Sequence, residues 1–277
     1  MRIAPALVVV CILVPATVSL GQRTSPSVRE AMRRGRLPGE TSQELRARLR
    51  MLESMDKLNA LGAEATPTKI RLGPKYRGGT GGMSLIKDFY GLESLEVIRP
   101  ASQITDAGLA IVAKIPSVQA IRIEGTRLTD TSLAHLARLT DLKQVALIDT
   151  GLTDASFRSF ASLRSLEAVR ISEPKFNGSG LSHLRQCSNL SSLQLEQSGV
   201  TDESLTHLEP FRSLRFLSVT DTQVSDEALL AMWRTNPDLL IVSAAGGKAA
   251  HKGEPFGVPV KETPSTTPRQ AIRPRVP

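Results

Sequence analysis

The sequence repeats with a constant period along most of its length. Six segments begin 24 residues apart without drift, and five of them carry an apolar residue, a hydroxyl residue and Asp in succession. Their first residues are Ile104, Leu128, Leu152, Phe176, Val200 and Val224. A fixed period of this length predicts a solenoid, in which one supersecondary unit is copied along an axis.

Two hydrophobic periodicities follow each other within every unit. Before each segment stand two apolar residues separated by one, such as Ile121 and Ile123, which is the period of a short strand with one buried face. After it, apolar residues recur at helical spacing, as in Leu133, Leu136 and Leu139. Each unit therefore reads as strand, turn, helix and return.

Aspartate occupies one repeated position where each helix should begin. Five of the six units have it, at Asp106, Asp130, Asp154, Asp202 and Asp226. A side-chain oxygen there can accept hydrogen bonds from the free amides of the first turn, and its charge suits the helix dipole. We interpret these residues as structural helix caps rather than catalytic carboxylates. The unit running from Glu173 to Gly178 lacks both the hydroxyl and the Asp, so an irregular turn and cap are expected there.

This pattern resembles the leucine-rich repeat family, in particular the ribonuclease-inhibitor-like class with the unit L-x-x-L-x-L-x-x-T-x-[IL]-T-D-x-x-L. The match runs from about Leu95 to Ser243, with a possible edge strand before it at Ile70 and Leu72. The resemblance implies an α/β leucine-rich-repeat solenoid with a curved parallel sheet on the concave side and helices on the convex side. Many proteins of this appearance are exported bacterial proteins.

The chain divides into five predicted segments. Residues 1–21 have the layout of a secretory signal peptide, with one Arg and then a short apolar run; an uncleaved membrane anchor is the alternative. A flexible basic linker at 22–40 precedes an N-terminal capping helix at 41–66, the repeat domain at 67–243 and a disordered, Pro-rich basic tail at 244–277. The sequence thus predicts export to the periplasm, the cell envelope or the exterior.

The helix within 41–66 has two interpretations. Its apolar residues mark one face, at Leu45, Leu49, Leu52, Met55, Leu58 and Leu61, and Thr41 to Glu44 resembles a capping box. A helix that seals the open end of the stack is the favoured reading, because terminal repeats would otherwise expose core. A partner-binding or dimerising helix is the alternative.

Charge and cysteine content limit the possible partners and crosslinks. Residues 22–50 hold eight Arg and three Glu, and 244–277 hold six basic and two acidic residues, whereas 51–243 carry a net charge of −2. A repeat domain that follows a phosphate backbone should itself be basic, so no nucleic-acid partner is predicted. Cys11 lies in the predicted signal and Cys187 falls in an apolar column, which leaves no internal disulfide.

No motif in the sequence predicts catalysis, a metal site or a cofactor. His135, His183 and His207 share one column without other ligands at metal-binding spacing. The glycine-rich stretch 78–82 lacks the Gly-Lys-Ser/Thr ending of a phosphate-binding loop, so a flexible loop is expected. Asn177 and Asn189 fit the N-glycosylation pattern, which is common by chance. The chain is therefore predicted not to be an enzyme.

The concave face of the sheet is the predicted binding surface. Residues that flank the buried pairs of each strand point away from the core, and six of them have side chains suited to an interface: Arg122, Gln144, Ile148, Arg170, Gln194 and Phe216. We expect an exported module that binds another protein there, against the alternative of an ordinary solvated sheet. A different possibility is a structural envelope or matrix protein, attached to anionic surfaces by its basic flanks.

Overall fold

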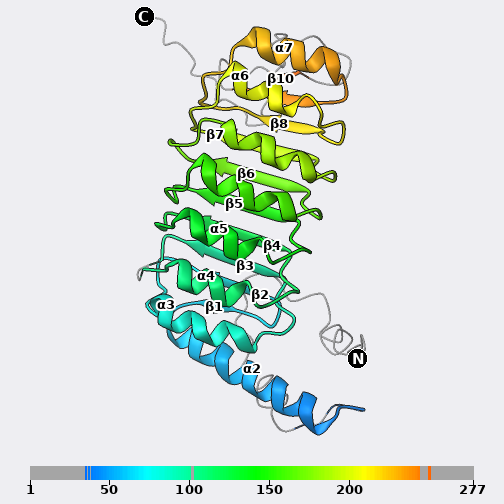
Figure 1. The fold of residues 1–277 in the computed structure, drawn as a ribbon. Coiled ribbons are helices and arrows are strands. Elements are labelled where there is room, and N and C mark those ends of the chain that lie inside the picture. The colour runs from blue at the N-terminus through cyan, green and yellow to red at the C-terminus, as the bar shows by residue number, and fades with distance from the viewer. Residues whose placement is uncertain (1–34, 36, 38, 101–102, 244–248, 251–277) are drawn as a thin grey trace, which may run out of the picture.

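In the computed structural model the chain forms an elongated stack of repeated units (Figure 1). The structure describes residues 35, 37, 39–100, 103–243 and 249–250. Strands lie one above another in a single sheet, and the short helices cover one of its faces. The stack begins at helix α2 and ends at helix α7. The predicted signal peptide lies outside the described residues.

Ten strands make up the sheet among the described residues, in the order of the sequence. The eight strands from β2 to β9 pair in parallel, whereas β1 and β10 are antiparallel to their neighbours. Their bounds are β1 (Glu64–Ala65), β2 (Lys69–Leu72), β3 (Ser94–Ile98), β4 (Ala120–Glu124), β5 (Gln144–Ile148), β6 (Ala168–Ser172), β7 (Ser192–Glu196), β8 (Phe216–Ser218), β9 (Leu240–Val242) and β10 (Ala249–Ala250). The expected strand at Ile70 and Leu72 is β2, but it is not the edge of the sheet, because β1 pairs with its outer side.

The connections between the strands contain short α-helices and 3₁₀ helices. Their bounds are α2 (Ser42–Ala60), α3 (Gly79–Gly82), η3 (Met83–Asp88), α4 (Asp106–Val112), α5 (Asp130–Leu136), η4 (Asp154–Ser162), η5 (Ser179–Gln186), α6 (Asp202–Leu205), η6 (Thr206–Leu208) and α7 (Asp226–Thr235). None of the helices in the described part of the chain combines the length and apolar character that crossing a bilayer requires.

The core is a set of apolar columns that run the length of the stack. Leu95 pairs with Ile121, Ile121 with Val145, and the same register continues strand by strand to Ile241. From β4 onward, each strand residue in these columns pairs with the residue 24 positions later in the next strand. Since every one of these side chains is buried, each unit covers the apolar face of its neighbours.

Helix α2 covers the N-terminal end of the stack. Its residues Leu52, Met55 and Leu58 are buried, whereas Leu45 and Leu49 near its start are only partly covered. Thr41 and Glu44 form the expected capping box, and the backbone and side-chain hydrogen bonds from Thr41 lower the pKa of Glu44. The segment 41–66 therefore contains a capping helix, and it also supplies strand β1.

Both predicted flexible flanks contain ordered residues next to the repeat domain. Before α2, the buried Glu40 carboxylate accepts from Arg48 Nε at 2.8 Å, and Arg48 also donates to the Gly35 carbonyl. After β9, Ala249–Ala250 form β10 and pair antiparallel with β9. The prediction of disorder across 244–277 is therefore wrong at these two residues, while most of both flanks lies outside the described residues.

Four of the five repeated aspartates accept hydrogen bonds from the next unit. Asp130 accepts from the backbone N–H and the hydroxyl of Thr153, at 3.0 and 2.8 Å. Asp202 accepts from the same two groups of Ser225, both at 2.7 Å. Asp106 is bound in the same way by Thr129, and Asp154 accepts from the amides of Asn177 and Gly180. The prediction that each carboxylate accepts from its own first turn was wrong for these four residues, because the stacked geometry brings the following N-terminus within reach.

Two units replace the aspartate by other means. Before α4, the Thr80 hydroxyl accepts from the Thr105 amide at 3.0 Å, which is the bond that an aspartate makes elsewhere. In the irregular unit Gly178 stands in the Asp position with φ of +90°. A Cβ there would come within 2.5 Å of the Ser204 Cβ, so glycine makes room for Ser204 to accept from the Thr201 amide itself.

The irregular unit also changes the turn at the end of its strand. The equivalent residues Gly125, Asp149, Gln197 and Asp221 all have positive φ, but Glu173 does not. Glu173 precedes Pro174, and a residue before proline is restricted to extended conformations. Its buried carboxylate instead accepts from the amide and hydroxyl of Thr150 in the preceding unit. As the sequence predicted, the turn and cap of this unit are irregular.

Replacing Asp106 by Asn should destabilise the fold at neutral pH and much less in acid. Burial acts to raise the pKa of Asp106, but the hydrogen bonds from Ser132 and Thr129 together hold it below its usual value. A folded-state pKa below the unfolded one gives stability that is present above about pH 4 and is lost as pH falls through the folded pKa. We expect a loss of about 1–2 kcal/mol at pH 7, measured by urea unfolding.

Asp141→Asn is the matched control for that variant. Asp141 is exposed and makes no hydrogen bond or ion pair with the described part of the chain. Its replacement should leave the free energy of unfolding within about 0.5 kcal/mol of the wild type. Equal losses in the two variants at pH 7 would show that the contact with the next unit does not stabilise the stack.

Candidate functional site

The candidate site is the sheet face that the helices leave uncovered, which we call the concave face. Along β4, β5 and β7 the buried residues alternate with residues that point to this face, and the register extends this alternation to the other parallel strands. The register aligns the residues of this face into three columns. The first column holds Ser94, Ala120, Gln144, Ala168, Ser192 and Phe216; the second holds Glu96, Arg122, Ala146, Arg170, Gln194 and Ser218; the third holds Ile98, Glu124, Ile148, Ser172 and Glu196.

The second column carries the two arginines predicted for binding. Arg122 on β4 and Arg170 on β6 are each paired in register with Ala146 on β5, which lies between them. Gln194 is the next residue of the column, on β7. Parallel strands are about 4.8 Å apart, so the arginine Cα atoms are separated by roughly 10 Å. The small Ala146 side chain is the only residue of the column between them.

Each of these arginines is held by a glutamate of the third column. Arg122 Nη2 donates to Glu124 Oε2 at 2.8 Å, and Arg170 Nη2 donates to Glu196 Oε2 at 2.8 Å. The arginine side chains remain 42% and 40% exposed. The Nε atom of each is buried without a hydrogen-bond partner among the described residues. The guanidinium groups are thus oriented by the protein while much of their donor capacity is unused.

More charged side chains join this arrangement at the N-terminal end of the face. Arg71 on β2 lies 3.5 Å from the carboxylates of Glu64 and Glu96, and Arg99 lies 3.3 Å from Glu124. The sequence analysis did not select these residues or the glutamates. Glu124 and Glu196 belong to the third column, which adjoins the column of the arginines. The 24-residue register of the sequence would therefore have been enough to predict the ion pairs Arg122–Glu124 and Arg170–Glu196.

The other predicted residues are spread over the face. Gln144 and Ile148 are on β5, on either side of Ala146, so they adjoin the arginine pair. Phe216 lies on β8, where its register neighbour is Leu240 of β9. Phe216 and Leu240 are both partly exposed, which makes the C-terminal end of the face apolar. The structure therefore places the six predicted residues on the consecutive strands β4 to β8, with Phe216 on the strand next to that of Gln194.

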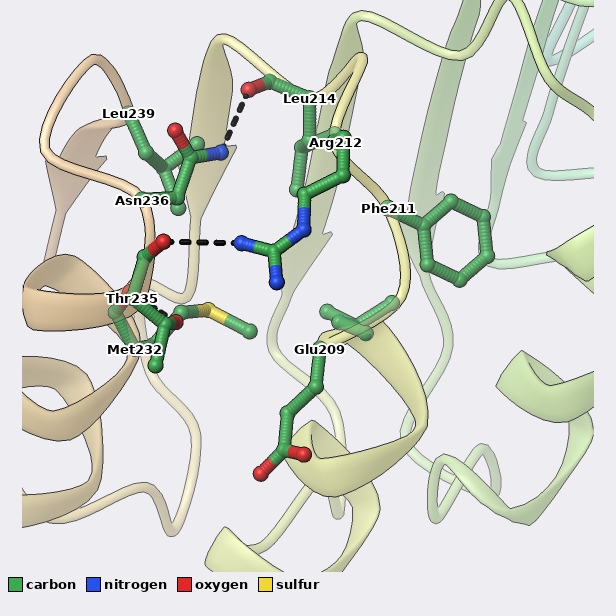
Figure 2. A pocket seen from close by; sticks show the side chains of 9 residues that line it. Glu209, Phe211, Arg212, Leu214, Met232, Thr235, Asn236 and Leu239 are labelled. Carbon is green, nitrogen blue, oxygen red and sulfur yellow. Dashed lines mark hydrogen bonds between the residues drawn. The ribbon is translucent and has the colours of Figure 1, made fainter.

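Two hollows in the described part of the chain lie at the return loops, away from the strands of the concave face. Figure 2 shows one of about 10 Å³, in which Arg212 donates to the Thr235 carbonyl at 2.9 Å and Asn236 donates to the Leu214 carbonyl at 3.0 Å. Such a volume holds about one water molecule. The polar groups there bond adjacent repeats to each other, so this hollow has the features of a structural contact.

A second hollow of about 230 Å³ lies beside Cys187, between the loops of two successive units. Cys187 is fully buried in the core, as the sequence predicted, and burial raises the pKa of its thiol to about 11. A thiol with that pKa is almost entirely protonated at neutral pH and is a poor nucleophile. Among the described residues, no group of three or more His, Cys, Asp or Glu side chains could hold a metal ion.

The glycine-rich stretch is an ordered part of the N-terminal end of the stack. It forms helix α3 and packs against Tyr76, whose hydroxyl donates to the Gly79 carbonyl at 3.1 Å. A Cβ at Gly78 or Gly82 would come within 2.5 Å of the Tyr76 hydroxyl. The expectation of a flexible loop was therefore wrong, and close packing on the buried tyrosine explains these two glycines.

Comparison with known proteins supports the fold and gives no closer identity. No protein-family model matches the chain, and no match is found among curated proteins. Solved structures do match: internalin C2 from Listeria monocytogenes is 22% identical with a TM-score of 0.51, over 63% of this chain and 70% of that chain. The internalin inlF from the same organism is 19% identical with a TM-score of 0.50, over 78% of this chain and 54% of that chain. At this identity the likeness establishes the leucine-rich-repeat solenoid fold.

Proposed function

We propose that this chain is an exported leucine-rich-repeat module that binds another protein through its concave face. The observation that carries the proposal is the second column, where Arg122 on β4 and Arg170 on β6 stand on either side of Ala146 and are each oriented by a carboxylate. Arginine held in one geometry loses little entropy on binding, which suits it to anchor an interface. Ile148 and Phe216 add partly exposed apolar surface.

The same features favour a binding role without catalysis. Solenoids present extended surfaces to partners, and leucine-rich-repeat folds such as those of the internalins are consistent with an interaction module. The concave face combines paired charges with small and apolar residues. We also propose that the repeats belong to the ribonuclease-inhibitor-like class, a proposal that rests on the repeat motif in the sequence. In the structure the connections of several units are 3₁₀ rather than α-helical, as in η4 and η5.

Mutation of three residues on the concave face should reduce partner capture without unfolding the chain. The variant combines Arg122→Ala, Arg170→Ala and Phe216→Ala. Exposed ion pairs contribute only about 0.2–1 kcal/mol each, so the circular dichroism spectrum and the melting transition should stay close to the wild type. Captured proteins, identified by mass spectrometry after affinity purification from the source organism, should decrease in amount. Undiminished capture would remove the concave face as the site.

Export rests on the predicted signal peptide at residues 1–21. Its short apolar run and small residues near Gly21 are typical of a cleaved secretory signal. Expressed in a secreting host, the full chain should be recovered outside the cytosol with a new N-terminus close to Gln22, as determined by N-terminal sequencing. A product that keeps Met1 and sediments with membranes would favour the uncleaved anchor instead.

A structural role in the envelope or matrix is the second proposal, supported by the charge distribution. Residues 22–50 and 244–277 carry net charges of +5 and +4, against −2 for 51–243. Attachment by these flanks should weaken steeply between low and physiological salt, because exposed charges are screened. It should also disappear when residues 22–40 and 251–277 are deleted, measured by cosedimentation with anionic vesicles. Adhesion that survives both changes would exclude the flanks as its cause.

A further inference from the structure

The chain contains four asparagines, and one of them is followed by glycine. They are Asn59, Asn177, Asn189 and Asn236, and Gly178 follows Asn177. An asparagine side chain can react with the backbone nitrogen of the next residue, because that nitrogen and the side-chain Cγ are held close enough to close a small ring. The reaction needs a nitrogen that carries a proton, is not engaged in a hydrogen bond and is not shielded by its own side chain.

Three of the asparagines fail one of these conditions. Asn59 lies in helix α2, where the amide of the next residue bonds to the preceding turn. Asn189 is followed by Leu190, whose amide donates to the Cys187 carbonyl at 3.1 Å. Asn236 precedes a proline, which has no N–H. The side-chain amides of these three residues are therefore expected to be stable.

Asn177 meets all of the conditions. It is exposed just before helix η5, and Gly178 has no Cβ to shield its nitrogen. The Gly178 amide donates no hydrogen bond to the described residues, so ring closure breaks none. Asn177 Oδ1 accepts from the Ser179 amide at 2.9 Å. The same N–H stabilises the negative charge that develops on Oδ1 when the nitrogen attacks, which lowers the barrier.

From this arrangement we infer that Asn177 is a site of spontaneous covalent modification in the folded protein. The Gly178 nitrogen bonds to the Asn177 Cγ and loses its proton, while the side-chain nitrogen takes up a proton and leaves as ammonia. Water then opens the cyclic imide. Opening at the new Cγ–N bond gives aspartate, and opening at the original backbone C–N bond gives isoaspartate. Water is the only reagent consumed, and nothing is oxidised or reduced.

The modification acts on a contact between successive units. The Asp154 carboxylate accepts from the Asn177 amide at 2.8 Å and from the Gly180 amide at 2.9 Å. Isoaspartate inserts an additional carbon atom into the main chain between these amides, so they no longer fit one carboxylate. The new carboxylate also places a second negative charge close to Asp154. The product should therefore weaken the stack between η4 and η5.

The test is to incubate the full chain, made in a host that does not glycosylate asparagine, and to follow each asparagine by mass spectrometry. Digestion in acid keeps the reaction slow during analysis. The peptide with Asn177 should gain the mass difference between an amide and a carboxylic acid, and an isoaspartyl methyltransferase should methylate it. Conversion should be at least roughly tenfold faster than at Asn189. The rate should rise with pH, because the attacking nitrogen must lose its proton.

Asn177→Thr is the matched control. Regular units have threonine at this position, and the amide and hydroxyl of Thr153 bind the aspartate of the preceding unit. The variant should fold like the wild type, gain no mass at this position and keep its melting temperature during incubation. The converted fraction of the wild type should melt about 2–4 °C lower than fresh protein.

Three results would count against this inference. If Asn177 keeps its amide in the folded chain for as long as Asn189 does, the site is not reactive and the assignment is wrong. Conversion in urea without conversion in native buffer would mean that the fold protects Asn177, which also overturns the assignment. Conversion with an unchanged melting temperature would contradict the effect on the contact between η4 and η5.

Discussion

The alignment of each unit with the next determines every other feature of this structure. From β4 onward each strand pairs residue n with residue n + 24, so equivalent side chains lie directly beside one another. The same register makes apolar columns on one face, open columns on the other and contacts between successive helix N-termini. Because a strand shifted by one residue would turn its buried residues outward, the apolar columns themselves fix the register.

Contacts between successive N-termini show how one structural need is met by different residues. Aspartates such as Asp130 accept from the N-cap amide of the following unit, which satisfies one of the free donors at the start of that helix. Thr80 fulfils the same need before the regular repeats begin, and Ser204 fulfils it where Gly178 removes the aspartate. What the stack requires is an acceptor at this point, and the identity of the residue that supplies it can vary.

The sequence was sufficient to predict the parts of the fold that depend on period. Strand positions, buried columns and the irregular unit at Glu173 all follow from residues compared at one spacing. The hydrogen-bond partner of each aspartate could not be predicted in this way. The aspartate is close in sequence to the amides of its own helix, whereas the amide that it binds in the next unit is close to it only in space. The packing of Gly78 on Tyr76 and the pairing of β10 with β9 are likewise tertiary contacts outside the repeat.

The same division explains why the concave face can hold a site. A buried leucine in the columns costs about 2–5 kcal/mol to replace by alanine, so those positions are constrained by stability. Arg122 is under no such constraint, since exposed ion pairs contribute little to the free energy of folding. The sheet nevertheless holds its backbone as rigidly as it holds the core. A surface whose side chains can change on a backbone fixed by its neighbours allows new partners to be recognised without a new fold.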